Sequence, residues 1–257
     1  MKAIFSPYLS RARSLRILML SGIIVLMSTL SCTSQKGQKG KNDQAEKIVM
    51  HSGDGPVFEI SFRKGPGHNH PLMAVWLEDT TGTYLQTLYV AESIGTGIFG
   101  HGRITAGHWE PGPLSRPAAL PYWWHKYGFL PTPEQPVPDA ISGPTPQGDF
   151  IMETDVPAGL PEKFAVQMEI NQSWDWNEYW TNDKYPDNAA YMTSSQPAVV
   201  YKTVVDKRMT DKKYRLKIIG HSHYAGENGN LYQDITTLTS ARQIAGEISV
   251  SIINRDK

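Results

Sequence analysis

The sequence predicts an all-β chain, folded as an antiparallel β-sandwich of immunoglobulin-like kind with one long Pro-rich insertion. About nine segments carry the apolar patterns of strands, and no helical pattern is long enough for a βαβ crossover. Of 18 prolines, 12 lie between Pro111 and Pro161, which excludes long helices and central strands from most of that span.

The first 31 residues have the features of a secretory signal. A positive start precedes a short apolar core, Ile17 to Met27, which is brief for a membrane span. We therefore expect residues 1–31 to be a lipoprotein signal peptide, residues 32–55 a lipidated cysteine with a flexible tether, and residues 56–257 the β-sandwich domain, with its insertion at 94–148.

The only cysteine, Cys32, lies where a bacterial lipoprotein signal peptide is cut, and its surroundings resemble a lipobox. A polar stretch follows it, so a core role for the thiol is disfavoured and we expect Cys32 to carry the lipid. The protein would then sit on the periplasmic face of a bacterial membrane, inner or outer, held by its acyl chains. With Cys32 used, no disulfide is possible.

The net charge of +0 shifts when the signal is removed, because the segment holds four of the 25 basic residues and no acidic ones. The remainder carries 21 basic and 25 acidic residues, and the basic residues are not clustered beyond the short tether. We therefore expect no nucleic-acid partner.

The first strands follow the tether. Pro56–Lys64 places Phe58, Ile60 and Phe62 on one face at a period of two, which is typical of a half-buried strand. Its expected partner is the next apolar run, Leu72–Leu77. That run ends in a turn cluster before Tyr84–Val90, so these two strands are predicted to form a hairpin.

The Pro-rich insertion carries an aromatic segment, Tyr122–Tyr127, that is predicted to make one or two helical turns. Bulky aromatic side chains in a secreted loop normally have a surface to bury against, so we expect the insertion to be ordered.

Strand patterns return after Asp149 and continue to the end. The clearest is Lys163–Ile170, where Phe164, Val166, Met168 and Ile170 alternate on one face. A bulge or a close backbone approach is expected at Gly246 in the last strand. The other predicted strands are Phe150–Glu153, Ala198–Val205, Tyr214–Ile219, Leu231–Leu238 and Gln243–Ile253.

The stretch from Asp139 through Ser142 and Gly143 to Thr145 has two interpretations. The pattern Asp-x-x-Ser-Gly-x-Thr resembles the acceptor at which a periplasmic flavin transferase joins the phosphate of FMN to a threonine, which here would be Thr145. Such acceptors usually have Ala before the threonine, whereas this chain has Pro144. The alternative is a plain type I turn over Thr145–Gly148.

Three longer stretches, Pro71–Asp79, Asp139–Gly143 and Glu169–Tyr179, resemble a family of predicted periplasmic proteins of unknown function. Members look like small β-sandwich domains and tend to be encoded near flavin transferases and PepSY-type membrane reductases, some linked to iron uptake. The resemblance implies an extracytosolic electron-transfer setting, with the transferase and the reductase as partners.

Two His-x-His pairs, His68 with His70 and His221 with His223, are candidate ligands of a divalent metal. On a strand, residues two apart point to one side, which suits metal binding. The alternative is that they are loop histidines that are solvated or hydrogen-bonded.

The segment Trp174–Trp180 follows the clearest predicted strand and is rich in aromatic residues. Trp174 and Trp176 are candidates for stacking on a flavin ring or a sugar. The alternative is a plug that caps the end of the core.

No nucleophile or catalytic pattern stands out, so no catalytic residue is predicted and an enzyme is the less favoured class. We expect an accessory or carrier protein of a flavin-linked or iron-related membrane system. A metal- or small-ligand-binding module using the paired histidines and a structural immunoglobulin-like interaction domain are the alternatives.

Overall fold

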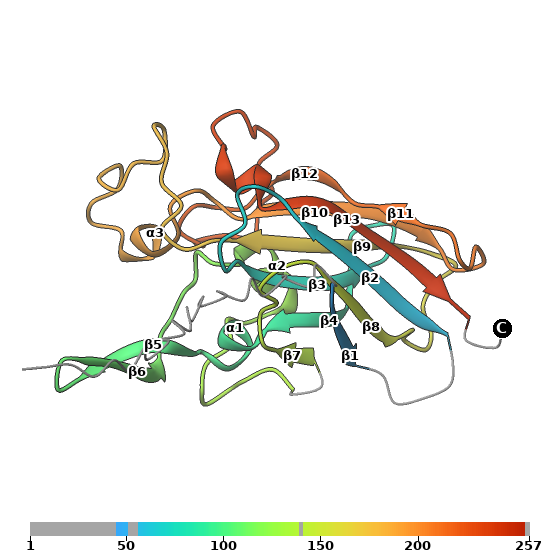
Figure 1. Cartoon of the computed structure of the whole chain (residues 1–257). Coiled ribbons are helices and arrows are strands. Elements are labelled where there is room, and N and C mark those ends of the chain that lie inside the picture. The colour runs from blue at the N-terminus through green and yellow to red at the C-terminus, as the bar shows by residue number, and fades with distance from the viewer. Residues whose placement is uncertain (1–44, 51–55, 139–140, 255–257) are drawn as a thin grey trace, which may run out of the picture. The chain divides into compact units, whose positions relative to one another are not determined.

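The computed structural model describes residues 45–50, 56–138 and 141–254. Strands make up 43% of the described residues and helices 11%, so this part of the protein is mostly β, as predicted. The described strands form a five-stranded, a six-stranded and a two-stranded sheet (Figure 1).

The five-stranded sheet has the order β1 (Glu46–Met50), β8 (Phe150–Asp155), β2 (Val57–Lys64), β13 (Ala245–Ile253) and β11 (Tyr214–Arg215). Its pairings are antiparallel except that β1 runs parallel to β8. The structure thus places a strand inside the range 32–55, where a flexible tether was expected.

The six-stranded sheet has the order β12 (Lys217–His221), β10 (Val199–Asp206), β9 (Lys163–Asn171), β3 (Leu72–Glu78), β4 (Tyr84–Ala91) and β7 (Ser142–Gly143). The predicted hairpin is confirmed, since β3 and β4 pair antiparallel. The short β7 lies at one edge and runs parallel to β4, so the pairing is not antiparallel throughout.

The predicted pairing of β2 with β3 is wrong. β2 pairs with β8 and β13, and β3 pairs with β4 and β9 in the other sheet. The two strands also differ in burial: β2 keeps part of one face exposed, whereas every residue of β3 is buried because both of its faces are covered.

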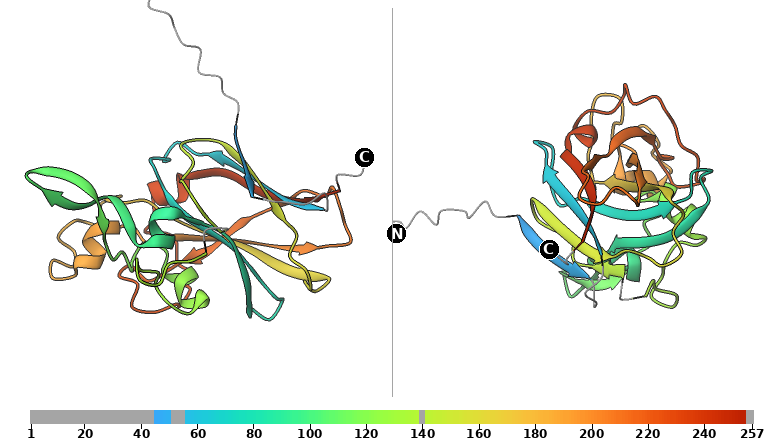
Figure 2. Two further views of the ribbon diagram at one scale, coloured as in Figure 1. Left: turned by 90° about the horizontal axis from the view of Figure 1, so that it is seen from below. Right: turned by 90° about the vertical axis from the view of Figure 1, so that its right-hand side faces the viewer.

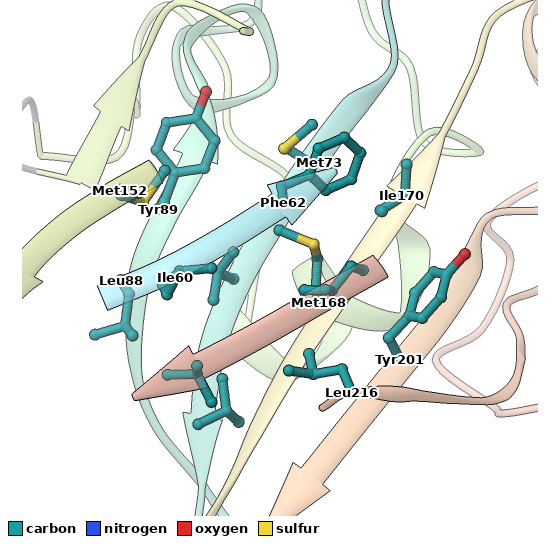
Figure 3. Packing of buried hydrophobic residues seen from close by; sticks show 14 of the residues in the cluster. Ile60, Phe62, Met73, Leu88, Tyr89, Met152, Met168, Ile170, Tyr201 and Leu216 are labelled. Atoms are coloured by element: carbon teal, nitrogen blue, oxygen red, sulfur yellow. The ribbon is translucent and has the colours of Figure 1, made fainter. Parts of the chain in front are cut away.

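The two larger sheets share one hydrophobic core. The alternating residues predicted to be buried in β2 and β9 do lie in it. The rings of Phe58 and Phe164 meet edge to face across the sheets with their centroids 5.6 Å apart. Figure 3 shows side chains of both sheets directed into the same space, among them Ile60, Met73 and Met168.

A second buried cluster covers the outer face of the six-stranded sheet. The insertion supplies the cover through α1 (Glu92–Thr96) and α2 (Pro121–Tyr127), and α2 confirms the predicted aromatic helical turns. Trp123 of α2 is fully buried there. The insertion also contains an unpredicted hairpin of β5 (Ile98–Thr105) and β6 (His108–Pro113), which extends away from the two sheets (Figure 2).

Two predictions in the second half are wrong in detail. The predicted strand Tyr214–Ile219 divides between sheets, since β11 pairs with β13 while β12 pairs with β10. The predicted strand Leu231–Leu238 is a loop with a single bridge, between His221 and Tyr232. By contrast, the bulge predicted at Gly246 is confirmed by a register shift between its neighbours.

The remaining helices connect the strands. The helix α3 (Ala189–Ser194) begins at Asn188, whose side-chain oxygen accepts a hydrogen bond from the Tyr191 N–H. A 3₁₀ turn, Ser240–Gln243, leads into β13 in place of the first residues of the predicted strand.

Candidate functional site

A cavity of about 260 Å³ lies where the chain leaves β9 and β12. Two loop segments form it together with the end of β12, and Figure 1 shows both at the same end of the six-stranded sheet. The lining residues are Tyr179, Trp180, His221, Ser222, His223, Tyr224, Tyr232, Asp234 and Thr237.

Asn177 fastens the two loop segments to each other. Its side-chain oxygen accepts hydrogen bonds from the N–H groups of Tyr179 and Trp180, at 2.9 Å and 2.7 Å. Its side-chain nitrogen donates to the Thr237 carbonyl at 2.9 Å. Asn side chains commonly stabilise turns by accepting hydrogen bonds from the backbone a few residues further on. Asn177 thereby fixes the position of Tyr179 and Trp180, which form the aromatic wall of the cavity.

The end of β12 holds the opposite wall in place. The backbone groups of His221 and Tyr232 exchange two hydrogen bonds of 2.8 Å. Their rings stack with an interplanar angle of 14° and centroids 5.4 Å apart. The Trp180 ring stands nearly perpendicular to the His221 ring, at 6.4 Å. His221 is thus enclosed by aromatic rings and is only 8% exposed.

The two histidines of the cavity hold different tautomers in their neutral forms. His221 Nδ1 lies 2.7 Å from the Ser222 carbonyl oxygen, so Nδ1 carries the proton and Nε2 offers a lone pair. His223 Nδ1 accepts from the N–H groups of Ala225 and Glu227, so its proton is on Nε2. Burial lowers the pKa of His223, which favours the neutral ring.

A buried carboxyl lies behind the cavity on the outer face of β9. Glu169 accepts hydrogen bonds from the N–H groups of Tyr122 and Trp123, at 3.2 Å and 2.7 Å. Burial raises its pKa to about 8, and a hydrogen bond from the Ser222 side chain acts in the opposite direction. Ser222 also lines the cavity, so Glu169 supports the cavity's wall from the side covered by α2.

The predicted flavin acceptor lies elsewhere on the sheet. Ser142 and Gly143 form β7, Thr145 follows it partly buried, and Asp139 lies outside the described residues. The Tyr89 hydroxyl donates to the Pro144 carbonyl at 2.9 Å and also lies 3.1 Å from the Gly143 carbonyl. Beyond Thr145, Gln147 and Gly148 form a bend.

The structure does not place the predicted aromatic platform beside this acceptor. Strands β4 and β3 separate β7 from β9, which leads into Trp174 and Trp176. Trp174 is 69% exposed, whereas Trp176 packs against the core and meets the Tyr191 ring edge to face. Trp180, 6% exposed, also belongs to the core, so this segment caps the core and contributes one cavity wall.

The first histidine pair occupies the loop between β2 and β3. His68 packs against the Phe62 ring, and its Nε2 is buried without a hydrogen-bond partner. Burial lowers the pKa of His68. His70 is exposed and has a positive φ of 53°.

Over the described ranges, no group of three or more His, Cys, Asp or Glu side chains is arranged to hold a metal ion. The predicted ligands His68, His70, His221 and His223 do not form such a group, and a metal site built from them stays a prediction. Cys32, the predicted lipid attachment point, lies outside the described residues. None of the helices in the described part is long and apolar enough to cross a membrane.

Sequence reasoning found the histidine pair and the aromatic segment of this cavity but missed Tyr232, Asp234 and Thr237. These three lie in the segment predicted to be a strand, which the bridge of Tyr232 to His221 and the hydrogen bonds of Thr237 with Asn177 and Trp180 hold at the site. No protein-family model, curated protein or solved structure matches the chain.

Proposed function

We propose that the protein is an extracytosolic small-ligand-binding module, built on an immunoglobulin-like sandwich and tethered to a membrane through Cys32. The observation that supports this proposal best is the aromatic-lined cavity containing His221 and His223. Concave sites with apolar walls and a few directed polar groups are the usual form of small-molecule sites. The protein would act as an accessory or carrier and not as a free-standing enzyme.

The size of the cavity limits the ligand. At about 260 Å³ the space lies just below the range of roughly 300–1,000 Å³ common for small-molecule sites. A small molecule, or the head group of a larger one, fits this volume.

The test uses the fluorescence of Trp180, which forms part of the cavity wall. Binding of at least one class among organic cations, sugars, carboxylates and free flavins should change the emission of the mature protein saturably. Trp180→Phe should lose that change and Tyr232→Ala should weaken binding. Trp109→Phe, on the exposed β5–β6 hairpin, is the matched control and should retain it. A flat response to every class would refute the proposal.

The membrane tether has its own test. Cys32→Ala should move the protein from the membrane fraction to the soluble fraction and should remove the lipid mass from the mature N-terminus. If the wild-type chain carries no lipid on Cys32, the tether is wrong, whatever the cavity binds.

A second candidate function is a flavin carrier with FMN on Thr145, serving a flavin-linked or iron-related membrane reductase. Its supporting observation is that Thr145 is partly exposed just beyond a backbone segment held by Tyr89. In the reaction, the Thr145 hydroxyl oxygen attacks the FMN phosphate of a flavin dinucleotide. AMP leaves with the electron pair of the broken phosphoanhydride bond, and the hydroxyl proton passes to a base.

Co-expression with a flavin transferase tests this candidate. The protein should become yellow and gain the mass of one FMN, and Thr145→Ala should abolish both changes. Pro144→Ala restores the residue usual in such acceptors and should increase the modified fraction. Colourless protein of unmodified mass, with Pro144→Ala as well as with the wild type, rejects the carrier function.

A further inference from the structure

The segments around the cavity are acidic although the whole chain is balanced. Residues 172–188 and 221–238, which supply the lining, contain six acidic residues and one lysine, against 25 of each sign in the full sequence. A cleft lined by one sign of charge raises the local concentration of ions of the opposite sign. The surroundings therefore favour a positively charged ligand.

The lining groups themselves are suited to a cation. The described lining includes no lysine or arginine, and its acidic member is Asp234. Hydrogen bonds from Thr236 hold the pKa of Asp234 below its usual value, so the carboxylate is charged at neutral pH. His221 adds the Nε2 lone pair described above, on a side chain that is more than nine-tenths buried.

The aromatic rings at the cavity already attract an ammonium group. Lys184, the one basic residue of these segments, places Nζ 3.3 Å from the centroid of the Tyr179 ring and 5.1 Å from that of Trp180. Lys184 is not among the residues that line the cavity. Ring faces bind cations through their negative electrostatic potential, and cages of Tyr and Trp recognise quaternary ammonium groups.

We propose that the cavity binds an organic cation, with a quaternary or methylated ammonium head among Trp180, Tyr179 and Tyr232 and with Asp234 as counter-charge. This inference rests on the proposed ligand-binding function and names the class of its ligand. A metal ion is a poorer match, because the described residues include no group of three or more His, Cys, Asp or Glu side chains arranged to hold one.

The experiment compares two probes of nearly equal shape and different charge. Isothermal titration calorimetry of the mature protein is carried out with choline and with its neutral isostere, 3,3-dimethylbutan-1-ol. Choline should bind at one site, and the isostere should bind at least about tenfold more weakly, because it lacks the charge that the rings and Asp234 recognise.

Three variants sharpen the comparison. Asp234→Asn keeps an oxygen for the Thr236 hydrogen bonds and should weaken choline binding severalfold. Lys184→Gln removes a like charge beside the rings and should strengthen it. Glu110→Gln, on the β5–β6 hairpin, removes a carboxylate that does not line the cavity and should leave the affinity unchanged.

The outcomes separate this inference from the proposed function. Equal binding of the two probes, or weaker choline binding in Lys184→Gln, overturns the cation class. If only a sugar, a carboxylate or a flavin binds and is sensitive to Trp180→Phe, the cation class is wrong and the ligand-binding function stands. If no class of molecule changes the emission of Trp180, both are wrong.

Discussion

At the scale of single residues, Glu169 should make the stability of the protein depend on pH. Burial raises its pKa from the ordinary 4.5 to about 8. Between these values the folded state binds more protons than the unfolded state, so the free energy of unfolding should fall as pH rises. The stabilisation is complete below about pH 4.5 and lost above about pH 8, with a slope of up to about 1.4 kcal/mol per pH unit from this group.

Denaturant unfolding at several pH values measures this dependence. Glu169→Gln keeps the shape of the side chain without the titration, so its stability should change less between pH 5 and 8, about the window of the two pKa values. Glu110→Gln, on the exposed hairpin, serves as the control and should retain the wild-type slope. Parallel curves for Glu169→Gln and the wild type would contradict the assignment.

The role of Glu169 was not predictable from the alternation in its own strand. That pattern correctly places Val166, Met168 and Ile170 in the core, which leaves Gln167 and Glu169 on the opposite face. A strand pattern cannot show that α2, about 46 residues away in the chain, covers this face. Nor can it show that two backbone N–H groups of α2 donate hydrogen bonds to the Glu169 carboxyl group. Burial by a distant segment therefore had to come from the structure.

At the scale of elements, the cavity depends on the close approach of β12 to the loop that carries Tyr232. A Cβ atom at Gly220 would lie 2.4 Å from the Tyr232 carbonyl oxygen, and Gly220 has a φ of 154°. Gly220→Ala should therefore push the loop away, break the bridge between His221 and Tyr232, and cost about 1–3 kcal/mol of stability.

Chemical denaturation and the Trp180 fluorescence assay measure the two effects, which should be lower stability and weaker ligand binding. Gly100→Ala is the matched control, because a Cβ there has no neighbour within 4 Å. It should change stability by at most about 0.5 kcal/mol. Normal ligand binding by Gly220→Ala would show that the bridge does not shape the cavity.

The same loop shows where element prediction from sequence stops. Strands with a clean period of two, such as β2 and β9, were predicted because one face of each is buried in the core. The segment Leu231–Leu238 has a similar apolar content, yet it makes only one bridge, that of Tyr232 with His221. Apolar content indicates that a segment tends to be buried, but it does not identify the strand with which that segment pairs.

At the scale of the whole molecule, composition and periodicity predicted a mostly β chain but not the distribution of strands between sheets. Pairing depends on contacts between residues far apart, such as Phe58 with Thr154 and Ile252. Adjacent strands in the sequence need not be neighbours, and here β2 and β3 face each other across the core. The short β11 and β12 are divided between the sheets for the same reason, since β11 is an edge strand beside β13 and β12 is an edge strand beside β10.

One core between the sheets implies that they unfold together. Phe58 is fully buried in the five-stranded sheet and contacts Phe164 in the six-stranded sheet. Phe58→Ala should cost about 3–5 kcal/mol of stability and should shift the unfolding midpoint equally by far-ultraviolet circular dichroism and by tryptophan fluorescence.

The tryptophan fluorescence reports on both clusters, because Trp180 belongs to the shared core and Trp123 to the outer cluster. Trp109→Ala, 61% exposed on the hairpin, should leave the midpoint nearly unchanged. Separate transitions for the two probes would mean that the outer cluster and the shared core are independent units. Because the cavity is built from core residues such as Trp180, it should then be lost when the core unfolds.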